Sequence, residues 1–163
     1  MSDKTEKNYP FQVDLRWTSG ATGIVTADDA EGSIEVSPPP AFGGQGKPWT
    51  PEHFFLGAIS SCFMTTYISF VKKFKFEITK FNCDVKGEIS LVEGKLVFAK
   101  IDLYSKISIT SPELSEKASL AFDKTKKYCI ISNSIQTPIN YHFELIVETQ
   151  TGIVADMNRN KTA

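Results

Sequence analysis

The residues with the most distinctive chemistry in this chain are three cysteines, Cys62, Cys83 and Cys129. A cysteine reacts as its thiolate, so its surroundings decide whether it is a nucleophile or a packing residue. Cys62 lies among apolar residues such as Ile59 and Phe63, where a free cysteine commonly behaves as a small hydrophobe. Cys129 ends the basic run KTKKYC and precedes IISNSI, a segment of one or two helical turns, and both features favour a thiolate. Both roles stay open for these two residues, and we expect none for Cys83.

The spacing of the cysteines and the composition of the chain exclude several classes of protein. The cysteines form no CxxC pair and have no histidine at zinc-ligand spacing, so neither a disulfide framework nor a metal site is expected. The polar start MSDKTEKNYP lacks a signal peptide, and we expect a cytoplasmic protein with reduced thiols. With 163 residues and a net charge of -1, we expect one domain over 1–163, with tails at 1–10 and 150–163, and no nucleic-acid partner.

Cys62 must be positioned by the stretch TPEHFFLGAISSCFMTTYISFVKKF, residues 50–74. Thr50 fits a helix N-cap, Pro51 the first helical position, and Glu52 the first turn, which favours an acidic residue. From Phe54 to Val71 the stretch has no charged residue, but serines and threonines interrupt its apolar run, which disfavours a membrane crossing. A helix apolar on nearly all sides needs protein around it, supplied by a curved sheet or a second copy of the chain. We therefore expect a core helix and no membrane partner.

The remaining elements are mostly strands. FQVDLRW alternates apolar and polar residues, and TGIVTA and GSIEVS extend it to an antiparallel meander. The loop PPPAFGGQGKPW follows, of the kind that often belongs to a site. After the long helix, EITKFNCDVKGEISL and KLVFAKIDLYSKISIT form a hairpin around VEGK. A second helix begins with Ser111 as N-cap and Pro112, and INYHFELIVE closes as a strand, whereas the tail from 149 shows no strong pattern.

Together these motifs resemble the OsmC/Ohr family of thiol-dependent peroxidases. The resemblance covers roughly residues 11–148 and rests on the Gly-rich loop, the helix start WTPEHFFL, SCF on the same helix, and YCIISN after the second helix. Ten residues separate Glu52 from Cys62, the offset that the family keeps between its helix-start glutamate and its peroxidatic cysteine. The segment from Cys129 to Asn133 matches the family's resolving motif except for its proline.

The resemblance implies an α+β fold in which an antiparallel β-sheet wraps around a long apolar central helix, with the order βββ-α-ββ-α-β, as an intertwined homodimer. It implies that Cys62 attacks an organic hydroperoxide and becomes a sulfenic acid, which Cys129 resolves as a disulfide. An external dithiol, possibly a lipoyl group, then reduces the disulfide, and no metal, haem or flavin cofactor takes part.

The family pairs the glutamate with an arginine that follows the first strand. This chain has only Arg16 and Arg159, and an ungapped alignment places Ala21 at the arginine position, so we expect Lys47 to supply the cation. Ten residues of helix separate Glu52 from Cys62 by about 15 Å, so Glu52 acts through another residue or from a partner subunit, or it serves only the helix dipole. His53 is a surface residue or a proton donor near neutral pH.

We expect an apolar substrate pocket formed by Phe42, Trp49, Phe55 and Phe63, with Phe54 beside them, although plain core packing explains each residue equally well. Two other functions stay open. The same fold could be a small-molecule binder in which Cys62 is inert, or a redox sensor that oxidises without turnover.

Overall fold

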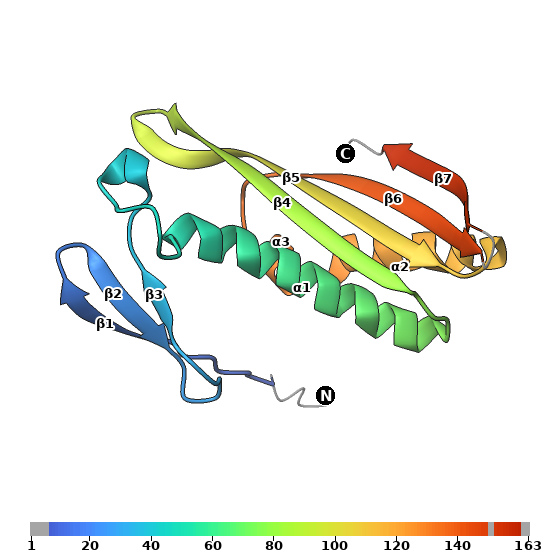
Figure 1. Ribbon diagram of the computed structural model, residues 1–163, viewed down its shortest axis with the longest axis horizontal. Helices are drawn as coiled ribbons and strands as arrows, with labels where there is room; N and C mark the ends of the chain where they lie inside the picture. Colours follow the sequence, from blue (N-terminus) through green and yellow to red (C-terminus); the bar gives the residue numbers. More distant parts are fainter. Residues whose placement is uncertain (1–6, 150–151, 161–163) are drawn as a thin grey trace, which may run out of the picture. The chain divides into compact units, whose positions relative to one another are not determined.

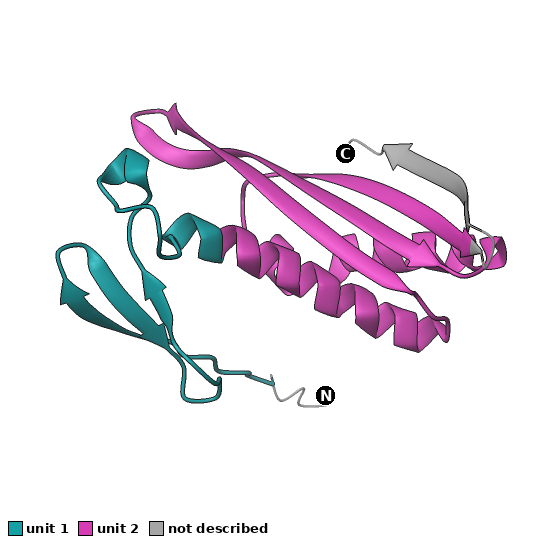
Figure 2. Cartoon of the chain, in the orientation of Figure 1, with its two compact units in different colours: residues 1–54 teal, residues 55–163 magenta. Residues whose placement is uncertain are grey.

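The computed structural model describes residues 7–149 and 152–160 of the chain. Two compact units make up the chain, residues 1–54 and residues 55–163 (Figure 2). The element order is three strands, the long helix α1, a strand pair, the helices α2 and α3, and two closing strands (Figure 1). This mixed α+β architecture is the fold class that the sequence predicted.

The first unit contains a three-stranded antiparallel sheet in the order β1-β2-β3. Its strands are β1 (Asp14–Ser19), β2 (Thr22–Thr26) and β3 (Ile34–Val36). The predicted first strand began at Phe11, but the ladder with β2 starts at Asp14, so the first three residues of FQVDLRW precede it. Leu15 and Trp17 alternate on one face of β1 and are 64% and 68% exposed. The sheet therefore presents an uncovered apolar surface within this chain.

The Pro- and Gly-rich loop after β3 is ordered. It contains the 3-10 helix η1 (Pro40–Phe42), and Trp49 hydrogen-bonds back to β3 through Glu35 O and the N–H of Ser37. A Cβ at Gly44 would lie 1.6 Å from the Pro38 carbonyl oxygen, so only glycine fits there. These constraints fix the chain just before it enters α1.

Helix α1 (Pro51–Phe74) begins as predicted, with Thr50 as the cap. The Thr50 hydroxyl accepts from the N–H of His53 at 3.3 Å, and His53 Nδ1 accepts from the N–H of Thr50 at 3.2 Å. By length and composition α1 could cross a membrane. However, every fourth residue is buried against protein in this chain, at Ile59, Phe63, Tyr67 and Val71. This pattern is that of a core helix with one partly exposed face.

The second unit is built on a four-stranded sheet in the order β4-β5-β6-β7. Its strands are β4 (Lys80–Val92), β5 (Lys95–Ile109), β6 (Ile139–Thr149) and β7 (Gly152–Asn160). β4 and β5 form the predicted hairpin, and Glu93 and Gly94 both have positive φ in its turn, at 49° and 78°.

The sheet departs from the prediction in two places. β6 pairs with β5 in parallel, because the chain between them crosses over through α2 and α3 and returns in the same direction. The tail, in which we expected no element, forms β7 and pairs antiparallel with β6. An edge strand is held by backbone hydrogen bonds to one neighbour, and these require no strong side-chain pattern.

The crossover contains η2 (Pro112–Leu114), α2 (Ser115–Tyr128) and α3 (Ile130–Asn133). Ser111 accepts from the N–H of Glu113, so the predicted cap is confirmed, although the first turn is 3-10 rather than α. Tyr67 of α1 donates to the Ala118 carbonyl of α2, and Phe63 packs edge-on against Phe122. The core thus joins α1, α2 and one face of the sheet, and it holds α3 next to the middle of α1.

Candidate active site

Cys62 lies on the middle turns of α1 and is partly buried. Burial alone would raise the pKa of its thiol. Hydrogen bonds from the backbone N–H of Ile131, the Cys129 thiol, the Thr66 hydroxyl and the backbone N–H of Ile130 outweigh burial and hold that pKa below its usual 9.0. The first turn of α3 thus directs its free N–H groups at the Cys62 sulfur.

Cys129 is the residue between α2 and α3, and it is fully buried. Burial raises the pKa of its thiol, and the neighbouring Cys62 raises it further. The Ser132 hydroxyl donates to the sulfur at 3.2 Å and lowers that pKa. The net direction is upward. The expectation that nearby lysines favour a Cys129 thiolate is therefore wrong. Lys126 and Lys127 lie over the rings of Tyr141 and Tyr128, at 5.1 and 5.6 Å.

Cys83 faces the core from β4. Burial, with smaller contributions from Asp84 and Cys129, raises the pKa of its thiol to about 12. Cys83 is thus the least reactive of the three thiols at neutral pH, in agreement with a packing role.

The two remaining thiols have complementary chemistry. The pKa of the Cys62 thiol is lowered and that of the Cys129 thiol is raised, so Cys62 has the larger thiolate fraction of the two, and the Cys129 thiol donates a hydrogen bond to its sulfur. A nucleophilic thiolate with a second thiol in contact can be oxidised by two electrons and then closed as a disulfide. In the part of the chain that the structure describes, no three His, Cys, Asp or Glu side chains are placed to bind a metal ion.

Glu52 lies on the first turn of α1, and its Oε2 is buried without a hydrogen-bond partner among the described residues. A buried carboxylate oxygen without a donor is costly, so we expect this atom to accept a hydrogen bond from water, from a cation or from another molecule. His53 acts in the helix cap, where its Nδ1 accepts the Thr50 N–H.

The other predicted residues of the first unit are exposed. Phe42 closes η1, Lys47 lies in the loop after it, and Trp49 contacts the rings of Phe54 and His53, at centroid distances of 5.8 and 6.0 Å. Phe42 and Trp49 are 50% and 53% exposed, so their rings are available for contact with another molecule.

Phe55 and Phe63 belong to the core of the second unit. Phe55 stacks on Phe98 of β5 with ring centroids 4.8 Å apart. Phe63 is 0% exposed and packs between Phe122 and Tyr141. These two aromatic side chains support the helix that carries Cys62.

The sequence reasoning missed several groups that contact the thiols. Thr66 donates to Cys62, Ser132 donates to Cys129, and Ser132 also hydrogen-bonds with Tyr141. Thr66 could have been found, because residues four apart share one face of a helix. The N–H groups of Ile130 and Ile131 carry no side-chain signal and depend on the tertiary placement of α3.

Comparison with known proteins identifies the family and the fold of the chain. Residues 44–144, which include both thiols and Glu52, match the family model described as OsmC-like protein. An OsmC-like protein of unknown function from Vibrio cholerae shares the fold, with a TM-score of 0.73, 19% identity, and coverage of 85% of this chain and 100% of that one. An organic hydroperoxide resistance protein from Elizabethkingia anophelis does so with a TM-score of 0.67, 22% identity, and coverage of 84% and 95%.

The chain is also similar, over most of its length, to a relative whose name states no function. The uncharacterized protein YmaD of Bacillus subtilis is 20% identical over 144 residues, covering 86% of this chain and 96% of that protein. Since the family model matches more than half of the chain, the chain belongs to the OsmC/Ohr family.

Proposed function

We propose that this protein is a thiol-dependent peroxidase that reduces organic hydroperoxides to alcohols inside the cell. The observation that carries the proposal is the set of hydrogen bonds that the Cys62 sulfur accepts from the Cys129 thiol and the Ile131 N–H. The proposal is also supported by the family, in which structural neighbours are named organic hydroperoxide resistance proteins.

In the first step the Cys62 thiolate attacks the distal oxygen of a hydroperoxide. An S–O bond forms as the O–O bond breaks, and the released alkoxide takes a proton to become the alcohol. The sulfur is oxidised by two electrons to a sulfenic acid, and the peroxide is reduced by the same two electrons. The N–H groups at the start of α3 stabilise the thiolate that begins this step.

In the second step the Cys129 sulfur attacks the Cys62 sulfenic acid. An S–S bond forms, and the hydroxyl leaves as water together with the proton of the Cys129 thiol. The raised pKa of Cys129 keeps this residue protonated until Cys62 has reacted, so the two thiols do not compete for the peroxide. An external dithiol, for which a lipoyl group is suited, then exchanges with the disulfide and returns both thiols.

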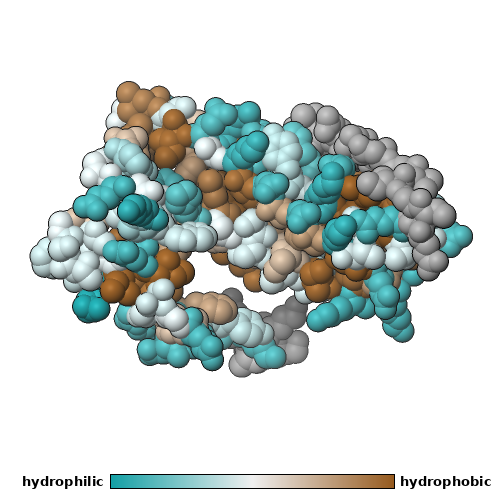
Figure 3. All heavy atoms as spheres, viewed as in Figure 1, coloured by the Kyte–Doolittle hydropathy of each residue, from teal (hydrophilic) through white to brown (hydrophobic). Residues whose placement is uncertain are grey.

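A homodimer completes the proposal. The apolar face of β1 and the orphaned Glu52 carboxylate both need a partner, and a second copy of the chain could cover the first and supply a donor to the second. Further support comes from the outer end of the β4–β5 hairpin, at the upper left of Figure 3, where Leu91 and Leu96 are 70% and 59% exposed. We assign Lys47, which is exposed in the loop before α1, as the cation for Glu52.

The exposed aromatic rings of Phe42 and Trp49 favour contact with the alkyl or aryl group of an organic hydroperoxide. Hydrogen peroxide carries a second hydroxyl in place of that group and gains less from such contact. We therefore assign organic hydroperoxides, rather than hydrogen peroxide, as the substrate class. Phe55 and Phe63 contribute from the core of the second unit, where they hold in place the helix that carries Cys62.

Turnover tests the proposal. With dithiothreitol as reductant, the wild-type protein should consume cumene hydroperoxide continuously and faster than hydrogen peroxide, and Cys62→Ser should not. Cys83→Ser, a matched removal of a thiol outside the pair, should retain activity. A single disulfide without further consumption would indicate a redox sensor, and inert thiols would indicate a binding protein; either result would overturn the proposal.

A further inference from the structure

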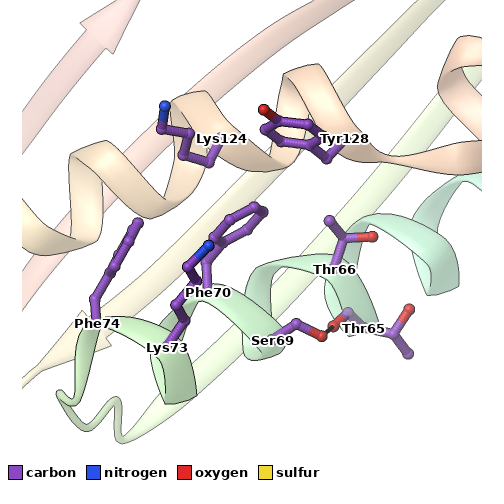
Figure 4. A pocket seen from close by; sticks show the side chains of 8 residues that line it. All are labelled: Thr65, Thr66, Ser69, Phe70, Lys73, Phe74, Lys124 and Tyr128. Carbon is purple, nitrogen blue, oxygen red and sulfur yellow. Dashed lines mark hydrogen bonds between the residues drawn. The ribbon is translucent and has the colours of Figure 1, made fainter. Parts of the chain in front are cut away.

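A pocket of about 560 Å³ opens between α1 and α2, one helical turn beyond Cys62 (Figure 4). Its walls include Thr66, Ser69, Phe70 and Lys73 of α1, and Lys124 and Tyr128 of α2. A volume of this size is typical of small-molecule sites. The proposed chemistry at Cys62 does not use this pocket.

Aromatic rings give the pocket an apolar wall. Phe70 points from α1 toward α2 in Figure 4, and its ring centroid lies 5.6 Å from that of Phe74 and 5.9 Å from that of Tyr128. The rings stand tilted to one another rather than closed into a tight stack. A wall of this kind favours a ligand with an apolar body.

The charged side chains that line the pocket are all positive. Lys73 and Lys124 line it, and none of its lining residues is acidic. Within the described residues neither lysine forms an ion pair, and the Lys73 amine rises toward α2 at 6.0 Å from the Phe70 ring. A lysine on a flexible four-carbon stem binds a carboxylate or another anion as a point charge. The unpaired cations therefore favour an anionic ligand.

The length of the pocket suits a carboxylate with an alkyl body. Seven residues of α1 separate Lys73 from Thr66, which is about 10 Å along the helix axis. A medium-chain carboxylate bound at Lys73 would extend along Phe70 and end at Thr66. Thr66 belongs both to the pocket and to the surroundings of Cys62, because its side chain lines the pocket and its hydroxyl donates to the Cys62 sulfur.

We propose that this pocket binds a medium-chain organic carboxylate, and that an occupied pocket slows the reactions of Cys62 through Thr66. The apolar end of the ligand excludes water from the Thr66 side of the thiolate and displaces the Thr66 hydroxyl, so the charged sulfur loses solvation and a donor. The binding step does not depend on peroxidase activity. The effect on reactivity rests on the proposed function, because it concerns the same thiolate.

Binding is tested with octanoate by calorimetry on Cys62→Ser protein, which removes any contribution from thiol chemistry. Octanoate should bind, octanamide, which has the same length but no charge, should bind about tenfold more weakly, and Lys73→Gln should weaken octanoate by a similar factor. Lys95→Gln, the same change at the exposed first residue of β5, is the matched control and should have no effect. Equal binding of octanoate and octanamide, or an unaffected Lys73→Gln, would overturn the pocket assignment.

The coupling to Cys62 is tested by the alkylation rate of wild-type protein. Saturating octanoate should slow iodoacetamide modification of Cys62 several-fold, and Thr66→Val should be slow already and insensitive to octanoate. Failure of peroxide turnover together with intact octanoate binding would refute the peroxidase alone. If octanoate does not bind and Phe70→Ala changes the oligomeric state instead, the pocket is an interface between copies and this inference is wrong.

Discussion

The Cys129 thiol, at the junction of α2 and α3, donates a hydrogen bond to the sulfur of Cys62 on α1. This contact shifts the pKa values of the two thiols in opposite directions, because it favours charge on the accepting sulfur and disfavours charge on the donor. Of the two thiols, Cys62 is therefore the more readily ionised and Cys129 the less readily ionised.

The first prediction concerns the order of thiol reactivity. Alkylation follows the thiolate fraction, which rises with pH and levels off above the pKa. Since the pKa of Cys62 is lowered and those of Cys129 and Cys83 are raised, Cys62 should be modified first at every pH from 6 to 8. Iodoacetamide labelling with peptide mass spectrometry measures the three rates separately.

Thr66→Val supplies the matched variant for that measurement. It keeps the shape of the side chain and removes the hydroxyl donor, so it should slow Cys62 alkylation at pH 7 by up to about tenfold. Thr65→Val, whose hydroxyl donates to the Cys62 carbonyl rather than to its sulfur, should change the rate little. Equal effects of the two variants would contradict the hydrogen bond to the sulfur.

A second prediction concerns packing between β4 and its neighbours. A Cβ at Gly87 would lie 2.6 Å from the Phe98 ring and 3.0 Å from the Leu56 side chain. Gly87→Ala should therefore lower the free energy of unfolding by about 1 to 3 kcal/mol, because Phe98 is also stacked on Phe55 and cannot easily retreat. Urea denaturation measures the change. Ser90→Ala, at an exposed position on the same strand, should stay within about 0.5 kcal/mol of wild type, and a similar loss there would refute the explanation.

A third prediction concerns pH and the outer face of the sheet. Asp102 accepts hydrogen bonds from Lys100 at 2.9 Å and from Asn140 and His142 at 3.2 Å; the bond from Lys100 contributes most to lowering the pKa of its carboxyl below 3.8. A lowered pKa in the folded state stabilises the protein above the unfolded pKa, and this contribution disappears as the pH falls through the folded value. Asp102→Asn should therefore destabilise the fold at pH 7 and progressively less below pH 3.8.

Thermal unfolding of wild type and Asp102→Asn between pH 7 and pH 2.5 makes this comparison. Asp84→Asn, an exposed carboxylate on the adjacent strand, is the control. A difference between wild type and Asp102→Asn that stayed constant down to pH 2.5 would show that the hydrogen bonds do not depend on the charge of Asp102.

A fourth prediction tests the dimer. Leu15→Asp places a charge on the exposed apolar face of β1 and should weaken self-association at least tenfold, since burial of a leucine contributes about 1.5 to 3 kcal/mol. Arg16→Asp, on the opposite face of the same strand, should have a much smaller effect. Light scattering over a concentration series measures both. A wild-type monomer at all concentrations would refute the homodimer.

Local rules predicted the parts of this fold that depend on short segments. The cap at Thr50, the turn at Glu93 and Gly94, and the cap at Ser111 each follow from residues within a few positions, and all are present. The parallel pairing of β6 with β5 and the edge strand β7 were missed, because strand partners far apart in sequence leave little local signal.

The candidate site, like the fold, has features that the sequence predicted and features that it did not. Cys62 and Cys129 were proposed as site residues from their motifs, and that assignment stays a prediction. The direction of the Cys129 pKa was predicted wrongly, because it depends on burial at the junction of α2 and α3 rather than on the preceding lysines. Phe63 was assigned to a pocket because an aromatic residue next to Cys62 fits either a site or a core. Its place between Phe122 and Tyr141 is decided by the helical period, which turns it toward the sheet.

The pairing of Cys62 with Cys129 is tested most directly by the mass of the protein after one equivalent of cumene hydroperoxide, with remaining thiols blocked and the disulfide mapped by digestion. We predict a rapid loss of two hydrogens, a Cys62–Cys129 link, a free Cys83, and no reaction in Cys62→Ser. If all three thiols stay reduced, or if the link involves Cys83, the proposed peroxidatic pair is wrong.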